Sequence, residues 1–545
     1  MPLEPAPAPG GLPLLGHAPR MLHRRLAFLE SLRELGPAAT IRLGHGTATV
    51  LSDHRLVRDV LTARAADFGL SPHFRVMKRI IGNGLLATDG PFHRRQRRLL
   101  MPALRHARLR AYAETMSELT ERRLEALEEE RQPIETDRML MALATENVTR
   151  CLFSSGIDER QVACVAEAVP VLMEWAGSRG MDPTGLLARL PDLVSPLNRR
   201  FRHSMAVLDT VVGGLIAARA TGLEGAATDG PPADGSPADD SRGDEGPHGD
   251  LLDAMLRAAD SRTGARMPRR QVHDEAMSFL IASTESVSRT LTWALHLLAR
   301  SPEARRALYA EADTVLAGRT ARWADLPRLT YTRGVLSEAL RLYPPGYLIS
   351  RTAVRETVLR AEGLGELPLP AGAMVMFSYY ALQRDPKLFP DPAAFRPERW
   401  TGAAEVTSDA PTDAPTDPPT DVTADVTADV TADVTADVAA EVAEGRPDAG
   451  AGPVPPVEGP AREAFLPFGL GPHGCLGEGF AWTEMTLVLA SLAARWELRA
   501  VRERPPRAVA AFSLSFDDAR MTAVPRVPGP RNPPHRPRNS PHRAP

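Results

Sequence analysis

The 545-residue chain is predicted to be mainly α-helical with a small β region. Residues 112–220 and 271–300 show the apolar spacing of long helices and contain few turn signals. Alternating segments rich in Val, Ile and Thr are short and few, and lie near residues 40–51, 347–353 and 511–524. These observations favour a helical body that carries a few short strands.

Composition sets the broad class. The net charge of −3 conceals two acidic segments, because residues 221–250 carry −7 and residues 401–460 carry −12, which leaves +16 on the rest of the chain. Three cysteines cannot build a disulfide framework, which is typical of a reducing cytoplasm. No run of about eighteen apolar residues is present, so no membrane span is predicted. Residues 1–16 are proline-rich and lack the pattern of a secretory signal, so we expect a cytoplasmic location.

The first elements are a helix, a hairpin and a second helix. Leu22 to Leu35 has helical spacing and is stopped by Gly-Pro. Residues 40–43 and 47–51 flank a Gly-His-Gly turn, as in a β-hairpin, and a helix follows from about Asp53 to Thr62. Residues 68–88 are predicted to be a loop.

A basic helix begins near Asp89. Residues 93–98 contain five basic side chains, and His93 and Arg97 are four apart, so they share one face. Two such donors suit a carboxylate or a phosphate. A solvated basic helix is the simpler interpretation of this run by itself.

Residues 221–250 consist mainly of Gly, Asp, Pro and Ser, and are predicted to be a disordered loop. The helix over 271–300 is mostly apolar, and small and hydroxyl residues, which include Ser283, Thr284 and Ser286, cluster around Glu285. Hydroxyl side chains can capture helix carbonyls and weaken the helix locally. An acid beside an alcohol can relay protons, although a capped acid at a kink explains the cluster equally well.

Two further motifs follow. Glu338 and Arg341 are three apart on a predicted helix and can pair, and the helix ends at Pro344-Pro345. Residues 347–353 read as a strand, in which alternation places Leu348 with Ser350 and Ile349 with Arg351. Residues 367–377 extend the small sheet, and 511–524 form a final hairpin.

Residues 401–461 contain an Asp-Val-Thr-Ala repeat. Acids at four-residue spacing would repel one another in a helix, so a disordered insertion is predicted. The simplest interpretation is a polar tract with no packed role. The alternative is a tethered acidic segment that competes with an acidic protein partner.

The most specific signal is the run Phe468-Gly-Leu-Gly-Pro-His-Gly-Cys-Leu-Gly477. Cys151 and Cys164 lie in apolar segments that are predicted to be helical, whereas Cys475 lies among four glycines and before a predicted helix. A helix N-terminus and backbone N–H groups favour a thiolate, which is a good ligand for a haem iron. A buried structural cysteine in a tight turn is the plainer alternative.

This run resembles the haem-binding loop of the cytochrome P450 family, with His473 where the family usually has Arg. Ala282–Ser286 resembles the family's Ala/Gly-Gly-x-Asp/Glu-Thr motif, with Ser283 and Ser286 as departures. Residues 395–400 match Phe-x-Pro-Glu-Arg-Phe/Trp. The resemblance covers about residues 10–400 and 462–526 in order. It implies one P450-fold domain over residues 1–526, interrupted by the two insertions, and a disordered basic tail over 527–545.

The resemblance also implies roles for individual residues. Cys475 would be the axial ligand of a haem b iron, and dioxygen would be the co-substrate. Phe468 and Gly477 would belong to the haem loop, and Glu285 and Ser286 would deliver protons. The residues expected to hold the haem propionates are His93, Arg97, Arg351 and His473. The residues expected to form a buried structural group are Glu338, Arg341 and Arg399.

The expected substrate pocket is apolar, which favours a hydrophobic substrate. Its candidate residues, chosen by analogy with the family, are Phe74, Val76, Ile80, Leu85, Met173, Phe279, Ala282, Leu348, Ile349 and Phe512. Residues 80–105 and 378–400 resemble bacterial members that oxidise cyclised sesquiterpenes, such as pentalenene oxygenases, so a terpene is expected. A fatty-acid hydroxylase, with Arg75 or Arg79 as anchor, and a peroxygenase are alternatives. A haem-thiolate sensor without turnover is the non-enzyme alternative, against which the acid–alcohol pair argues.

Partners follow from what the chain lacks. No flavin or nicotinamide fingerprint occurs, so electrons are expected from a separate, ferredoxin-type carrier. We expect a monomer that binds a hydrophobic small molecule and no nucleic acid.

Overall fold

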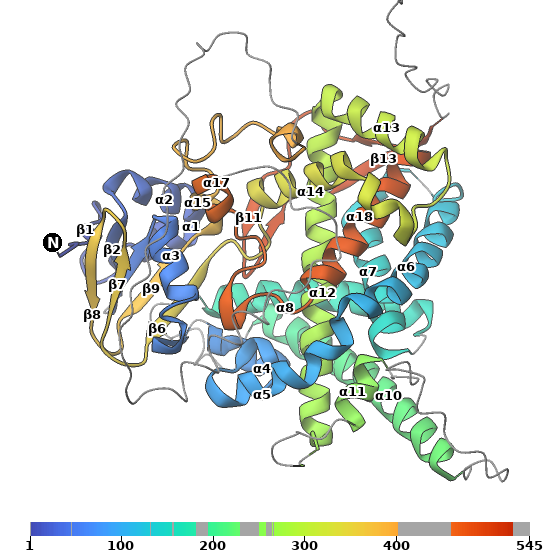
Figure 1. Ribbon diagram of the computed structural model, residues 1–545, viewed down its shortest axis with the longest axis horizontal. Coiled ribbons are helices and arrows are strands. Elements are labelled where there is room, and N and C mark those ends of the chain that lie inside the picture. The colour runs from blue at the N-terminus through green and yellow to red at the C-terminus, as the bar shows by residue number, and fades with distance from the viewer. Residues whose placement is uncertain are drawn as a thin grey trace, which may run out of the picture.

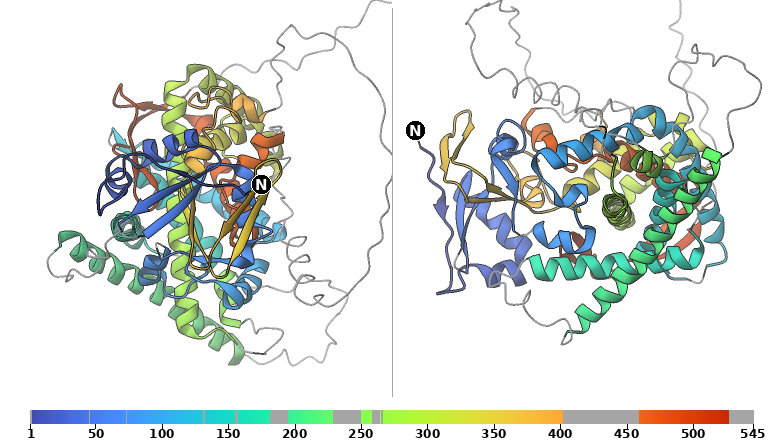
Figure 2. Two further views of the ribbon diagram at one scale, coloured as in Figure 1. Left: turned by 90° about the vertical axis from the view of Figure 1, so that its left-hand side faces the viewer. Right: turned by 90° about the horizontal axis from the view of Figure 1, so that it is seen from below.

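The computed structural model (Figure 1) describes most of the chain. The described residues are 2–44, 46–72, 74–130, 132–154, 157–180, 195–228, 250–257, 264, 266–401 and 459–526. The predicted class is confirmed, because helices form one large body and the main sheet lies at its side (Figures 1 and 2).

The helical body surrounds one long central helix, α12. The helices are α1 (Ala18–His23), α2 (Arg25–Leu32), α3 (His54–Leu61), α4 (Lys78–Ile81), α5 (Gly90–Leu100), α6 (His106–Ala126), α7 (Thr136–Phe153), α8 (Glu159–Gly180), α10 (Pro196–Thr228), α11 (Leu251–Arg257), α12 (Arg269–Arg300), α13 (Pro302–Leu316), α14 (Thr330–Leu342), α15 (Tyr379–Leu382), α17 (Gly459–Ala464) and α18 (Glu478–Arg495). Helix α12 packs against α7, α10, α14 and α18, which explains why its sequence is apolar on nearly every side.

The sheets are small. The strands are β1 (Ala6–Pro7), β2 (Ala38–Leu43), β3 (Gly46–Leu51), β4 (Phe68–Leu70), β5 (Ile134–Glu135), β6 (Ile349–Ala353), β7 (Thr357–Ala361), β8 (Gly365–Leu369), β9 (Met374–Phe377), β10 (Trp496–Ala500), β11 (Ala508–Ala510), β12 (Leu514–Phe516) and β13 (Arg520–Pro525). The main sheet has the order β1-β2-β3-β9-β6-β4, and β10-β13-β5, β11-β12 and β7-β8 stand apart. In the main sheet Arg351 lies opposite both Leu70 and Val375.

Most predicted elements are present. The hairpin β2–β3 and helix α3 are confirmed, and the Asp53 side chain caps α3 by accepting the Arg55 N–H at 2.9 Å. The predicted loop over 68–88 instead contains β4, α4 and two short 3-10 helices, η3 (Phe74–Met77) and η4 (Leu85–Ala87). These pieces are too short for hydrophobic periodicity to reveal them.

Three boundaries differ from the predictions. Residues 221–228, predicted as loop, continue helix α10, and residues 459–461, predicted as insertion, begin α17. The predicted hairpin over 511–524 is divided, because β11 pairs with β12 whereas β13 pairs with β10. The rest of the two predicted insertions (229–249 and 402–458) and the tail 527–545 lie outside the described residues.

One described helix is long and apolar enough to cross a membrane by length and composition. It is Pro196–Thr221 within α10, with a mean hydropathy of 1.3, and a third of this window is buried. Its exposed positions are small or polar, such as Ala206, Gly214 and Ala217. Its large apolar residues, such as Leu208 and Val212, are buried where the helix packs against α8 and α12. Small residues therefore raise the hydropathy of an ordinary surface helix, so one such helix is weak evidence for a span.

Candidate active site

The cysteine loop joins α17 to α18 and turns sharply beneath the helical body. The Cys475 N–H donates to the Phe468 carbonyl at 2.8 Å, and the Gly474 N–H donates to the Gly471 carbonyl at 2.9 Å. Gly471 has φ 67°, and a Cβ there would lie 1.9 Å from the Leu61 carbonyl oxygen. Only glycine allows this approach, so the loop is fixed against the end of α3.

Cys475 stands two residues before the N-cap of α18, and protein atoms leave its side chain exposed. Desolvation of the thiolate by the surrounding protein atoms and the charge of the nearby Glu478 raise the pKa of the thiol to about 11. The Gly477 N–H at the start of α18 lowers this pKa, in the direction expected from the sequence, but its effect is smaller than those of desolvation and Glu478. The sulfur would ionise only with help from a bound cation or metal.

The four basic residues predicted to bind propionates come together above this loop. The His93 and His473 rings are 4.2 Å apart between centroids, and the Arg97 guanidinium donates to the Gly474 carbonyl at 2.8 Å. Burial lowers the pKa of both histidines, and the guanidinium of Arg351, from β6, adds to this effect. For His93 the pKa falls to about 3, so its ring is neutral at neutral pH.

Sequence reasoning missed an acid in this cluster. Asp89, the N-cap residue of α5, lies 3.2 Å from the His473 ring and accepts the Leu70 N–H at 2.6 Å. Hydrogen bonds from His473 and Leu70 hold the pKa of Asp89 below its ordinary value even though burial opposes them. The available signal was Asp-Gly-Pro at a helix start, which predicts a cap and no ligand.

Helix α12 presents a partly uncovered face in the middle of its buried length. Ala282, Ser283 and Ser286 are half-buried, whereas the flanking residues are buried. The Ser286 hydroxyl donates to the Ala282 carbonyl at 2.7 Å, and the helix remains continuous. The structure therefore shows the predicted hydrogen bond from a hydroxyl side chain to a helix carbonyl, but α12 is not interrupted at this point.

The Glu285 carboxylate turns away from Ser286. It accepts a hydrogen bond from Ser513, in the turn between β11 and β12, and lies 3.7 Å from Arg289. Arg289 in turn donates to Asp137 of α7 at 2.7 Å. Burial raises the pKa of both carboxyl groups despite the shared guanidinium. Sequence reasoning did not find Ser513, Arg289 or Asp137, since they lie far apart in sequence or outside the motif.

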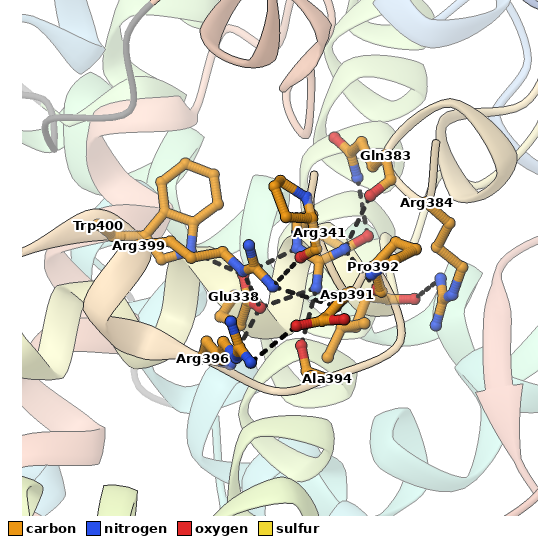
Figure 3. A network of polar contacts seen from close by, with 12 residues as sticks. Glu338, Arg341, Gln383, Arg384, Asp391, Pro392, Ala394, Arg396, Arg399 and Trp400 are labelled. Carbon is orange, nitrogen blue, oxygen red and sulfur yellow. Dashed lines mark hydrogen bonds and ion pairs between the residues drawn. The ribbon is translucent and has the colours of Figure 1, made fainter. Parts of the chain in front are cut away.

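Glu338, Arg341 and Arg399 meet in a buried polar network (Figure 3). Glu338 and Arg341 form two hydrogen bonds of 2.8 Å and are fully buried, and the Arg399 Nε lies 3.3 Å from Glu338. Arg341 also donates to the carbonyls of Gln383, Pro392 and Ala394. Gln383 accepts the Leu466 N–H at 3.1 Å, which ties the network to the start of the cysteine loop.

The candidate pocket residues gather only in part. Ile80, Leu85, Met173 and Phe279 belong to one core cluster, against which Val76 and Phe512 pack. Phe74 and Phe512 meet edge to face at 5.6 Å between ring centroids. Leu348 packs instead in the N-terminal cluster with Met21 and Phe28, and Ile349 lies against a third cluster. Leu348 and Ile349 are thus both separated from the set, because alternation turns them to opposite sides and each side packs in a different cluster.

The family model described as "Cytochrome P450" matches residues 5–412 and 457–516 of this chain. This chain belongs to the cytochrome P450 family. The match omits residues 413–456, which lie within the predicted insertion 401–461.

Three curated relatives of this P450 come from Streptomyces. The cyclooctatin synthase of Streptomyces melanosporofaciens is 36% identical over 95% of each chain. The cyclooctat-9-en-7-ol 5-monooxygenase of the same organism is 33% identical, over 91% of this chain and 89% of the relative. The pentalenene oxygenase of Streptomyces avermitilis is 30% identical, over 96% and 98%. The expected family, enzyme class and bacterial kinship are therefore confirmed, and the chain is a P450 monooxygenase.

The P450 family implies a haem iron and the use of dioxygen, and the residues present fit this group. Cys475 offers an uncovered sulfur, and a Cβ at Gly477 would meet no atom within 4 Å. Arg97, Arg351 and His473 supply donors suited to carboxylates beside that loop. The half-buried residues Ala282, Ser283 and Ser286 leave part of one face of α12 uncovered by protein atoms.

Proposed function

We propose that this P450 is a haem-thiolate monooxygenase that oxidises a hydrophobic terpene with dioxygen and electrons from a ferredoxin-type carrier. Bound haem b would supply the activation of dioxygen, from which one oxygen atom enters the substrate and the other leaves as water. The observation that supports the proposal is the gathering of the basic cluster against the loop of Cys475, where Arg97 donates to the Gly474 carbonyl and the His93 and His473 rings meet.

The residues of the chain divide the remaining work. Cys475 would bind the iron through its sulfur, and the metal would drive off the thiol proton that burial otherwise retains. Arg97, Arg351 and His473 would bind the propionates, and neutral His93 would donate one hydrogen bond. Phe468 and Gly477 would shape the loop around the ligand.

Ser286 and Glu285 would hold and move protons by different routes. Ser286 lies on the uncovered side of α12, and its hydroxyl would donate a proton there after leaving its hydrogen bond to the Ala282 carbonyl. Glu285 shares a guanidinium with Asp137, so two buried carboxyl groups have one cation, which favours a proton held on the pair. Because the Glu285 carboxylate contacts Ser513 and Arg289 while the Ser286 hydroxyl contacts the Ala282 carbonyl, a water molecule or a side-chain rotation must link the two groups.

A terpene substrate is supported by the relatives and by the apolar cluster. Two of the relatives are named for oxidation of pentalenene and of cyclooctat-9-en-7-ol, an alcohol. Ile80, Leu85 and Phe279 present no charge to a substrate. Arg79, the anchor a fatty acid would need, lies over the Trp175 ring at 5.8 Å.

The test is a spectral titration of the purified holoenzyme with a panel of cyclic terpenes and fatty acids. We expect the substrate-type shift of the Soret band with terpenes at micromolar concentration and none with fatty acids. Tight binding of fatty acids alone would replace the terpene assignment with the fatty-acid hydroxylase. A cytoplasmic location, a monomeric state and a ferredoxin-type donor remain predictions.

A further inference from the structure

Three polar side chains of α12 hold the turn that follows α4. The Asn83 N–H donates to Asp274 Oδ2 and the Leu85 N–H donates to Glu275 Oε2, both at 2.8 Å. Gln271 Nε2 donates at 2.8 Å to both the Asn83 carbonyl and Glu275 Oε1. Three of these hydrogen bonds join a side chain of α12 to the main chain of the turn, and the fourth joins the Gln271 and Glu275 side chains.

The turn lies directly on the helix. A Cβ at Gly82 would stand 2.3 Å from the Asp274 carboxylate, and one at Gly84 would stand 2.0 Å from Ser278 Oγ. Two glycines therefore permit an approach that any side chain would block. Glu275 is fully buried and Asp274 and Gln271 are 8% exposed, so water does not compete for these hydrogen bonds.

Few charges act on this group. Asp274, on the same helix, is the charge that acts on Glu275 and raises its pKa, after burial as the first cause. Among the described residues of the helices packed against this part of α12, Lys78 and Arg79 on α4 are exposed, Asp209 of α10 pairs with His273 of α12, and Arg219 of α10 pairs with Asp253 of α11.

The turn separates two expected pocket residues. Ile80 and Leu85 lie on either side of it, and Phe279 and Ala282 follow Glu275 on α12 by about one and two turns. Ile80 and Leu85 form one wall of the expected pocket, and Phe279 and Ala282 on α12 form the other. The hydrogen bonds between α12 and the turn set the distance between these two walls. No sequence motif marks this fastening, since its acids belong to an otherwise apolar helix.

We propose that Gln271, Asp274 and Glu275 form a polar clamp that positions the Ile80–Leu85 wall against α12 and so sets which substrates fit. The three are positioning residues, and the proposal rests on the proposed function only in taking this wall as part of the substrate pocket.

The clamp carries a titratable group, so its hold depends on pH. Burial raises the pKa of Glu275 from 4.5 to about 7. When the turn is released into water, the carboxyl group regains its ordinary pKa, so release is favoured as pH rises through the clamped value. The release equilibrium should increase about tenfold between pH 6 and pH 8. Glu275→Gln stays neutral and should abolish this dependence.

The first measurement is hydrogen exchange of the backbone amides of residues 82–87 in the holoenzyme, corrected for the intrinsic exchange rate. The wild type should exchange about tenfold faster at pH 8 than at pH 6, and Glu275→Gln should be flat. Glu484→Gln, which neutralises another buried acid far along the chain on α18, should behave as the wild type. A slope that persists in Glu275→Gln, or vanishes in Glu484→Gln, would overturn the clamp.

The second measurement compares imidazole with 4-phenylimidazole as iron-binding probes of pocket width. Gln271→Ala retains both carboxylates and carries the test if Glu275→Gln does not fold. We expect the ratio of the two Kd values to change by about threefold or more in either variant, because only the larger probe reaches the wall. A ratio within about twofold of the wild type in both variants would refute the positioning role. If neither probe shifts the wild-type spectrum, the haem site is at fault, and the exchange measurement still decides the clamp.

Discussion

At the scale of single residues, Cys475 decides whether this chain is a haem-thiolate enzyme. We predict that the reduced, carbon monoxide-bound protein has the red-shifted Soret band of a thiolate adduct. Cys475→His should lose this band and turnover together, because imidazole donates less electron density. The control is Cys164→Ala, since Cys164 is an exposed cysteine on α8. A normal thiolate band in Cys475→Ala would disprove the ligation.

Ser286 is predicted to time proton delivery. Ser286→Ala should keep haem and substrate binding and divert reducing equivalents to hydrogen peroxide, because the hydroxyl on the uncovered face of α12 is gone. Thr292→Val is the control, because its hydroxyl also returns to a carbonyl four residues earlier but is buried. The measurement is product formed per electron consumed. Unchanged coupling would assign the role to Glu285 or to an ordered water.

Glu484 is a buried acid outside the site, and its geometry predicts a neutral carboxyl group. It accepts from Asn147 Nδ2 at 2.8 Å, while Glu484 Oε2 and Asn147 Oδ1 have no hydrogen-bond partner among the described residues. A proton on Oε2 could join these two atoms, and burial raises the pKa of Glu484 to about 8.

The folded pKa of Glu484 is higher than the unfolded value, so its stabilising effect is complete below pH 4.5 and is lost as pH rises through 8. Glu484→Gln keeps both hydrogen bonds without a charge. We therefore expect the wild type to lose Tm relative to this variant between pH 6 and pH 9. Parallel Tm curves would mean that the carboxyl group is hydrated.

The residues that sequence could not supply share one property. Asp89, Ser513 and Asp137 belong to no recognisable sequence motif. Each contacts a site residue only after the chain has folded. Asp89 reaches His473 across nearly four hundred positions, and Ser513 reaches Glu285 from a turn near the C-terminus. Motif spacing identified Cys475 and Arg341 because their partners lie within one loop or one helical turn.

At the scale of elements, the network around α14 fastens the loops that precede the cysteine. Arg341→Ala should destabilise the protein by about 3–5 kcal/mol, because it removes both 2.8 Å hydrogen bonds to the buried Glu338 and leaves the more distant Arg399 as the remaining cation beside that carboxylate. Arg399→Ala should cost less, about 1–2 kcal/mol, because its longer contact leaves the Glu338–Arg341 pair intact. Thermal unfolding of both variants tests this order, and equal losses would contradict it.

Element prediction succeeded where periodicity was long. Helix α12 and the hairpin β2–β3 match their sequence patterns, because each buries a face of clear period. The pairing of strands that are distant in sequence could not be predicted from the sequence. Strand β13 pairs with β10 and β5 and does not pair with β12. The continuation of α10 through residues 221–228 also escaped prediction, since Gly and Ala carry little periodic signal.

At the scale of the whole molecule, a strongly acidic segment joins a basic core. The segment between Thr401 and Gly459 carries −12, and its flanks meet where the Trp400 and Phe465 rings lie 4.4 Å apart. Phe465 stands ten residues before Cys475. The acidic segment thus joins the chain shortly before the cysteine, and the alternative to a polar tract with no packed role is that it competes with an acidic electron carrier.

Deleting residues 402–458 with a short Gly/Ser bridge separates the two interpretations of this segment. The bridge can be short because the two flanking rings are already in contact, and α17 must stay because Ala464 is buried. A polar tract with no packed role predicts the same apparent KM for an acidic ferredoxin with and without the segment, at low and at high salt, and this is the result we expect. Competition would instead lower the KM of the deletion variant at low salt, and the difference would shrink as salt screens the charges. A scrambled segment of equal charge is the control, because competition by charge alone would survive scrambling.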